Sequence, residues 1–369
     1  MNFILKIDNF VTFIGGHQFF FFFPKMTSLI TAAGADGAVA APSTLTLAEC
    51  EKYDRQIRLW GIEAQQRLQN SRVLFAGQFR AVSAEISKNL VLAGFSASIM
   101  DPDVATAEDL GANFLLTEDG VGQNRALAAH ARLQELNPMV KVTAIAQSTD
   151  TISSEFLKAE QYNVVVLSGP VPKSEIIRIN HACRATGAAF FYVDMFGFLG
   201  IGFSDLGDNF AYRSGGADEG TETLSPVKFA HIEAALNTPW SELSSRRFGT
   251  PSIYYAWYCL LHYMEHKGTT SVTIAADLAA IKAYGNDLCQ RQGNANRQLL
   301  SDSVLDTLVQ CHACDVSAAC AIMGGLMGQE IVKSIARKSK PLQNVLLLDA
   351  FAQAGRGGVN CSIIPPSLK

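Results

Sequence analysis

A chain of 369 residues, 48% hydrophobic and 17% charged, is long enough for about two globular domains with a full buried core. Thirty basic against 34 acidic residues give a net charge of -4, and no block of Lys and Arg stands out. This balance indicates neither nucleic acid nor an anionic membrane as a partner, and eight scattered cysteines suit a reducing compartment better than a disulfide framework.

The first 25 residues are rich in Phe and differ in composition from everything that follows. Their apolar core, residues 10–23, is shorter than the ~20 residues needed to span a bilayer, and His17 and Gln18 interrupt it. A signal peptide is one interpretation, but we favour a gene-model extension ahead of a natural start at Met26. The Gly- and Ala-rich stretch after it favours disorder, so we assign 1–44 to a disordered or mis-annotated extension.

Order is expected to begin at Leu45 with a helix. Thr46 and Glu49 have the spacing of a capping box, and Gly61 is a natural stop. The helical period places four apolar side chains on one face: Leu47, Tyr53, Ile57 and Trp60. Arg55 and Arg58 fall on a different face, away from this apolar stripe.

Residues 72–95, "RVLFAGQFRAVSAEISKNLVLAGF", predict a strand, a turn at Gly77 and a helix, which is the architecture of a phosphate loop. Such a loop normally carries further glycines, because the backbone must approach the phosphates and the helix must pack closely on the strand. Here the positions two, three and five after Gly77 hold Phe79, Arg80 and Val82.

Helices and strands then alternate, which favours a parallel, doubly wound sheet. The expected elements are a strand at 97–100 ending in Asp101, a helix at 121–138, strands at 140–146 and 162–169, a helix at 173–187 and a strand at 188–194. Beyond Phe203 the alternation is lost. There we expect an exposed acidic loop at 212–225, several helices over 251–308, a long amphipathic helix at 318–338, and strands at 344–351 and 359–364.

Several motifs resemble the activating enzymes of ubiquitin and ubiquitin-like modifiers, which share the ThiF/MoeB adenylation fold. They are "YDRQIRLWG" (53–61), "NPMVKV" (137–142), "GQEIVK" (328–333) and the strand-loop-helix between them. The resemblance runs from about Cys50 to the C-terminus and is thin over 205–310. Within the family, motif order and length most resemble the small, non-catalytic subunit class of the heterodimeric SUMO-activating enzymes.

The resemblance implies an α/β fold: a ThiF/MoeB-like, doubly wound Rossmann-type sheet whose parallel strands are followed by an antiparallel C-terminal part, with a small helical insertion. We therefore expect a pseudo-adenylation domain at 45–205, an acidic loop and helical insertion at 206–310, and a C-terminal helix and strands at 311–369 that complete the adenylation fold.

Family members that catalyse adenylation hold Mg-ATP with a glycine-rich loop, an acidic residue for the ribose, an Arg and an Asp that handles magnesium. At the matching positions this chain keeps Asp101, has Ala112 in place of the Arg, and offers Ser168 and Gly169 in place of the Asp. Gly77 stands alone in its loop, so we interpret the loop as vestigial. Val82 would hold helix and strand apart, while Phe79 and Arg80 would occupy the triphosphate's space.

In the family, the non-catalytic half extends an Arg from its opening helix to the ATP bound by its partner, and Arg55 matches that residue. A guanidinium can hold phosphate oxygens bidentately and neutralise charge as pyrophosphate leaves. The plainer alternative makes Arg55 a solvated helix residue paired with Asp54 or Glu51, and Arg58 is expected to be structural. The resemblance thus implies no nucleotide bound by this chain alone and Mg-ATP in the partner's site.

Other candidate sites have structural alternatives. Asp101 is expected to be a turn cap more than a ribose acceptor, and residues 323–328, "MGGLMG", favour close helix packing over phosphate binding. Cys311 and Cys314 have metal spacing, but zinc needs four ligands, so we expect buried thiols and no metal site. Cys183 has apolar neighbours and is expected in the core.

The expected partners are the catalytic large subunit of a SUMO-activating enzyme and SUMO. The family resemblance alone implies a nuclear location, with a cytoplasmic one in addition. Three alternatives remain: the corresponding subunit for another ubiquitin-like modifier, a self-contained MoeB-like adenylyltransferase, and a nicotinamide-dependent oxidoreductase. A lone Gly77 weakens the last of these.

Overall fold

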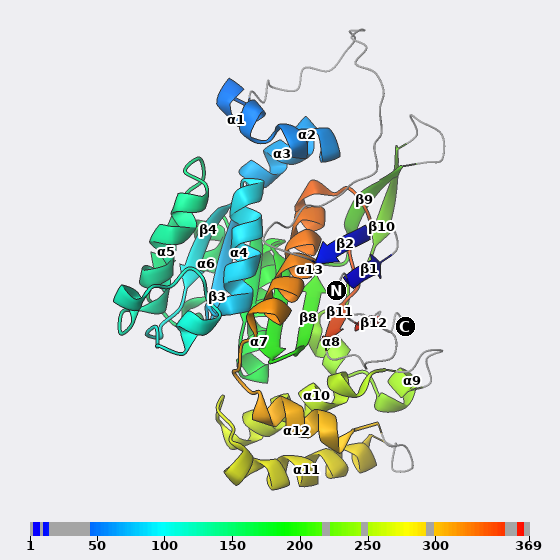
Figure 1. The fold of residues 1–369 in the computed structure, drawn as a ribbon. Helices are drawn as coiled ribbons and strands as arrows, with labels where there is room; N and C mark the ends of the chain where they lie inside the picture. Colours follow the sequence, from blue (N-terminus) through cyan, green and yellow to red (C-terminus); the bar gives the residue numbers. More distant parts are fainter. Residues whose placement is uncertain are drawn as a thin grey trace.

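The structure is a computed structural model, and it describes residues 3–7, 10–14, 45–215, 222–244, 250–292, 299–350 and 360–364. A mixed sheet forms the centre, and helices cover both of its faces (Figure 1). Its strands are β3 (Arg72–Gly77), β4 (Ser96–Met100), β5 (Val142–Ile145), β6 (Val164–Ser168), β7 (Ala189–Phe196), β8 (Leu199–Asp205), β11 (Val345–Asp349) and β12 (Asn360–Ile364).

The strand order is β12-β11-β8-β7-β6-β3-β4-β5. From β7 to β5 the neighbours pair in parallel, whereas β8, β11 and β12 pair antiparallel. The order reverses next to β3, where a doubly wound sheet opens its ligand crevice beyond the carboxyl ends of the strands. The predicted α/β fold class, with its antiparallel C-terminal part, is confirmed.

The sheet separates two apolar cores. Along β3, Val73 and Phe75 face one core, and Leu74 and Ala76 face the other. The first core lies under α4 (Ala81–Ala93), α5 (Arg125–Leu136) and α13 (Ser317–Ala336), and the second under α6 (Ser154–Ala159), α7 (Lys173–Thr186) and α10 (Ser252–Lys267). Both faces are buried, which is why the central strands are continuous apolar runs in the sequence.

The predicted opening helix is divided into α1 (Leu47–Lys52) and α2 (Asp54–Trp60). Helix α2 ends at Gly61, as predicted, and α3 (Ile62–Gln69) follows it. Its capping box is present, with the Glu49 backbone N–H donating to Thr46 Oγ1 at 3.3 Å. The helix breaks at Tyr53, which is buried and accepts a hydrogen bond from Asn137 at 2.8 Å. Leu47 is 79% exposed whereas Tyr53 is buried, so the predicted single apolar face does not extend across the break to Leu47.

Helix ends follow local chemistry. Helix α5 begins at Arg125 rather than at 121, because the Asn124 side chain caps the backbone N–H of Leu127 at 3.1 Å. Helix α7 ends where Gly187 takes φ +76°, as its sequence predicts. Short 3-10 turns occupy Asp109–Gly111, Glu118–Gly120 and Thr149–Thr151.

The region after β8 contains a second small sheet of β9 (Phe210–Gly215) and β10 (Glu222–Val227). The predicted exposed loop over 212–225 was therefore wrong at both flanks, while its middle lies outside the described residues. The antiparallel register pairs Phe210 with Val227, and Phe210 meets Phe229 edge to face, with ring centroids 6.0 Å apart. This apolar contact anchors the hairpin.

The predicted helices after residue 251 are confirmed as α10, α11 (Ile274–Arg291) and α12 (Asp302–Gln310), preceded by α8 (Ile232–Leu236) and α9 (Trp240–Ser244). In the N-terminal extension, β1 (Phe3–Ile7) pairs with β2 (Phe10–Ile14), and the rest lies outside the described residues. Among the described helices, none combines the length and apolarity that a membrane crossing requires.

Candidate functional site

The loop after β3 begins with the glycine that the sequence singles out. Gly77 has φ +92°, and a side chain there would collide with the carbonyl oxygen of Ser168 on the neighbouring strand. Ser168 also bonds the loop through its hydroxyl group, which lies 2.6 Å from Ser83 Oγ and 2.9 Å from the Gln78 carbonyl oxygen. Both the backbone carbonyl and the side-chain hydroxyl of Ser168 therefore hold the first turn of the loop against β6.

Every backbone donor from Gln78 to Ala81 is already used inside the chain. Gln78 N–H donates to the Ser168 carbonyl at 3.0 Å, and Arg80 N–H to the Gln78 carbonyl at 2.9 Å. Phe79 N–H donates to Asp101 Oδ2 at 2.7 Å, and Ala81 N–H to Asp315 Oδ2 at 3.1 Å. A phosphate loop works by offering such groups to phosphate oxygens.

Asp315 lies at the N-terminus of α4, where a phosphate-binding loop would place its anion. Its carboxylate accepts from Ala81 and lies 3.3 Å from Arg80 Nε, while Arg80 also donates to the Ala313 carbonyl. The positive end of the helix is thus neutralised by a carboxylate from the segment before α13. Sequence reasoning missed Asp315, because nothing in its local pattern ties it to a loop 234 residues earlier.

The two bulky loop side chains have different positions. Phe79 is buried in the core and meets Phe75 edge to face, with ring centroids 5.9 Å apart. Arg80 instead stays at the helix terminus with Asp315. The expectation that both fill triphosphate space therefore needs correction: Phe79 turns inward because the loop carries a large apolar side chain beside an apolar core.

Asp101, at the ribose position after β4, is fully buried and makes three hydrogen bonds. It accepts from Phe79 N–H at 2.7 Å, Asp103 N–H at 2.8 Å and Arg125 Nη1 at 2.7 Å. Arg125 also reaches Asp109, with Nε 3.3 Å from the carboxylate. Although burial lowers the pKa of Arg125, Asp101 and Asp109 outweigh it and raise that pKa above its usual value. In this geometry Asp101 is a turn cap that joins the loop to α5.

Asp194 adds another carboxyl to this region of the sheet, on β7, and is buried. It accepts hydrogen bonds from the Met195 backbone at 2.9 Å and from the Tyr192 hydroxyl at 3.2 Å. Burial raises its pKa to about 7, with Arg80 opposing that rise and Asp315 adding to it. The carboxylates around the loop make it a poor environment for a polyphosphate.

The raised pKa of Asp194 predicts a pH-dependent stability. Its unfolded pKa is near 3.8 and its folded pKa about 7, so the unfolded chain releases the proton first and stability falls as pH rises between these values. From about pH 5 to pH 8 we expect wild type to lose roughly 3 kcal/mol of unfolding free energy relative to Asp194→Asn.

Urea unfolding of both chains across this pH range measures that difference. Parallel pH profiles for the two proteins would contradict it, because the substitution removes only the titrating carboxyl.

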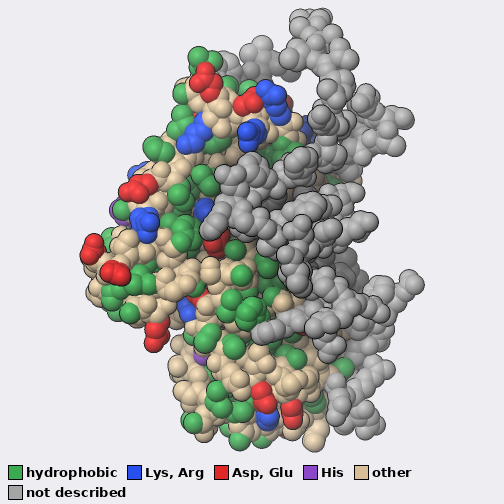
Figure 2. Space-filling model, viewed as in Figure 1, with side chains coloured by type: hydrophobic (Ala, Val, Ile, Leu, Met, Phe, Trp, Pro, Cys, Tyr) green, Lys and Arg blue, Asp and Glu red, His purple; other side chains and the backbone are tan. Residues whose placement is uncertain are grey.

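Arg55 lies on α2 and is exposed, and no hydrogen bond or ion pair to it occurs among the described residues. The expected structural role of Arg58 agrees with its position, since its Nε lies 3.0 Å from Asp54. That pair also uses the carboxylate that could have held Arg55. Figure 2 shows basic side chains gathered beside acidic ones at the end of the molecule formed by α1–α3.

Arg55 is not beside the loop of its own chain. Helix α2 contacts the C-terminal end of α4, where Gln56 donates to the Leu92 carbonyl at 3.1 Å. The loop lies at the other end of this 13-residue helix, a separation of about 20 Å along its axis. An Arg55 side chain that acts on a nucleotide must therefore act on one held elsewhere.

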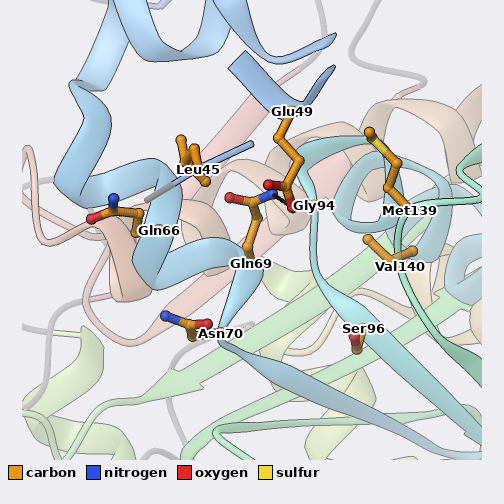
Figure 3. A pocket seen from close by; sticks show the side chains of 9 residues that line it. All are labelled: Leu45, Glu49, Gln66, Gln69, Asn70, Gly94, Ser96, Met139 and Val140. Carbon is orange, nitrogen blue, oxygen red and sulfur yellow. Dashed lines mark hydrogen bonds between the residues drawn. The ribbon is translucent and has the colours of Figure 1, made fainter. Parts of the chain in front are cut away.

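A cavity of about 350 Å³ opens near the start of β4 (Figure 3). Glu49 and Gln69 meet across it, with Gln69 Nε2 donating to Glu49 Oε1 at 3.1 Å. Gly94 and Ser96 place it at the amino end of β4, opposite the carboxyl ends where doubly wound sheets bind nucleotides. The cavity therefore does not replace the loop as a nucleotide site.

The cysteines and the glycine run singled out in the sequence occupy different environments in the structure. Cys183 is buried, as predicted, and burial raises the pKa of its thiol. Cys311 is half-buried and Cys314 exposed, so the expectation of two buried thiols was wrong for Cys314, which lies in an exposed turn before α13. Gly324 and Gly328 face α4 at contact distance from Glu85 and Asn89, which confirms the helix-packing interpretation.

Comparisons with known proteins agree on one family. Residues 53–361 match the model of the ThiF family. The chain is 32% identical over 339 residues to SUMO-activating enzyme subunit 1 of Homo sapiens, covering 85% of this chain and 95% of that protein. It is 31% identical to the proteins of the same name from Danio rerio, over 83% of this chain and 93% of that one, and from Dictyostelium discoideum, over 84% and 93%.

Proposed function

The chain belongs to the ThiF family, and from that premise we propose that it is the small, non-catalytic subunit of a heterodimeric SUMO-activating enzyme. It takes part in SUMO activation by completing a Mg-ATP adenylation site held by a catalytic large subunit. There the C-terminal carboxylate of SUMO attacks the α-phosphate and pyrophosphate leaves. Nuclear residence is part of the same proposal.

One observation carries the proposal: the backbone N–H groups of Gln78 to Ala81 are all engaged within the chain. Two of them donate to buried or half-buried carboxylates, Asp101 and Asp315, so a phosphate would have to displace an anion at each position. Such exchange leaves a buried charge without its partner, which is costly. The chain alone is therefore a poor nucleotide binder.

The second support comes from Arg55, which is exposed and about 20 Å from its own loop along α4. Because no hydrogen bond or ion pair to Arg55 occurs in the described part of the chain, its guanidinium can reach a nucleotide across a subunit interface without breaking such a contact. Once there, it would bind phosphate oxygens in a fork and stabilise the charge of departing pyrophosphate.

The experiment is SUMO-dependent exchange of pyrophosphate into ATP, measured with the chain alone, the partner alone and the pair. We expect exchange only with the pair, and no saturable ATP binding by the isolated chain. Exchange by this chain alone would refute the proposal and favour a self-contained adenylyltransferase. Replacing SUMO by another ubiquitin-like modifier tests the remaining alternative within the family.

A further inference from the structure

We propose that His181, His231 and Glu233 form a binding site for one divalent ion of the zinc class, on the surface where α7 meets α8. Each residue offers one ligand atom, and these atoms all lie within 4.8 Å of one another. The site is separate from the loop and from Arg55, so it does not depend on the proposed function.

The ligand atoms are close to a coordinating arrangement. His181 Nε2 lies 3.1 Å from Glu233 Oε2. In a tetrahedral site with metal–ligand distances of about 2.0–2.1 Å, neighbouring ligand atoms are about 3.3 Å apart. The His181 and His231 rings lie 5.7 Å apart and are tilted by 41°. A small side-chain movement of His231 would therefore complete a three-ligand set around one ion.

The backbone beneath these side chains is held by buried contacts. Asn180, adjacent to His181, accepts a hydrogen bond from the backbone N–H of Ile232, which lies between the other two ligands, at 3.0 Å. Both Asn180 and Ile232 are about 1% exposed. Arg184, one turn further along α7, donates to the Phe229 carbonyl at 2.7 Å. Helix α7 and the start of α8 are thus fixed relative to each other, and little ordering is left for an ion to impose.

The chemistry of the set selects the ion. Two imidazoles and one carboxylate suit zinc and related transition metals, whereas calcium and magnesium take mainly oxygen ligands. The side chains of His181 and Glu233 are 53% and 45% exposed, so an ion can enter from solvent. Three protein ligands leave a fourth position for water.

His231 also caps α8, and the loss of this cap on metal binding lowers the expected affinity for the ion. The Ala234 backbone N–H donates to His231 Nδ1 at 3.2 Å, so the neutral ring carries its proton on Nε2. Coordination through Nδ1 would displace this hydrogen bond, and coordination through Nε2 would require the proton to move to Nδ1. Either way the cap is lost, and we expect micromolar rather than nanomolar binding.

The cap also supplies the test variant. Asn is among the best N-cap residues and lacks an imidazole, so His231→Asn keeps the helix start and removes the metal ligand. Glu233→Gln removes the negative charge of the carboxylate ligand with almost no change in side-chain shape. The matched control is His266→Asn, an exposed histidine outside the cluster, on α10.

The experiment is calorimetric titration of the full, tag-free chain with Zn²⁺, repeated with Co²⁺ followed by absorbance. We expect one ion at this site, at least about tenfold weaker binding in His231→Asn and Glu233→Gln, and wild-type binding in His266→Asn. The Co²⁺ complex should lack a thiolate charge-transfer band. Binding unchanged in both cluster variants, a thiolate band that accounts for all bound ion, or no binding at millimolar Zn²⁺ would each overturn the proposal.

Discussion

Arg55→Ala should slow SUMO-dependent ATP:pyrophosphate exchange by the assembled pair by about 10²- to 10³-fold, the range seen when a single charge-stabilising donor is removed from a transition state. The reason is that the exposed Arg55 guanidinium makes no hydrogen bond within the described part of its own chain. Its removal therefore costs the fold little and takes a positive charge from the reaction, whereas the other arginine of this helix, Arg58, is paired with Asp54.

The chain supplies a matched control on the same helix. Arg58 is also exposed, but it pairs with Asp54 at 3.0 Å. Arg58→Ala should leave exchange within about twofold of wild type. Arg58 makes a surface ion pair with its own helix, and such a pair contributes at most about 1 kcal/mol to the stability of the fold. Arg55→Lys keeps the charge but loses the planar fork, and it should fall between the two.

Two readouts separate a role in the reaction from a role in assembly. Gel filtration should show the pair intact in Arg55→Ala, and the KM for ATP should change less than kcat if the contact strengthens in the transition state. Exchange in Arg55→Ala equal to that in Arg58→Ala would show that the finger assignment is wrong. Loss of the pair itself would make Arg55 an interface residue instead.

Much of the central sheet could be predicted because burial on both faces produces continuous apolar runs, as in β3 and β6. The end of α7 could also be predicted, since Gly187 stops that helix locally. The predicted helix boundaries were wrong where a single side chain determines the boundary. The Asn124 cap moved the start of α5, and the buried hydroxyl of Tyr53 broke the opening helix.

The candidate site could be predicted only in outline. Gly77 and Asp101 stood out because each follows an apolar strand, and Arg55 because of the motif around it. Their partners did not, because Arg125 and Asp315 meet the loop only when distant segments fold together. The same reason hides the cluster on α7 and α8, where His181 and Glu233 are 52 positions apart and share no spacing motif. Local periodicity carries no information about such contacts.

Arg125 anchors the loop through a buried ion pair, and its replacement should destabilise the fold strongly. Asp101 is fully buried, and Arg125 is its charge partner at 2.7 Å. Arg125→Met would leave that carboxylate buried and unpaired, which costs about 3–5 kcal/mol of unfolding free energy. Urea unfolding near pH 7 measures it. Arg132→Met replaces an exposed arginine of the same helix whose Nη1 donates to two backbone carbonyls, at 3.1 and 3.3 Å, and it should cost about 1 kcal/mol, because it leaves no buried charge without a partner.

The double variant Asp101→Asn/Arg125→Met decides whether the loss comes from the stranded charge or from the missing side chain. Because a neutral amide has a much smaller burial cost than a carboxylate, the double variant should recover at least about 1 kcal/mol over Arg125→Met. If the pair instead matters only through packing, the double variant would be as unstable as Arg125→Met or less stable. Recovery would mean that the charge on Asp101 needs a partner in the folded chain, and that Arg125 supplies it.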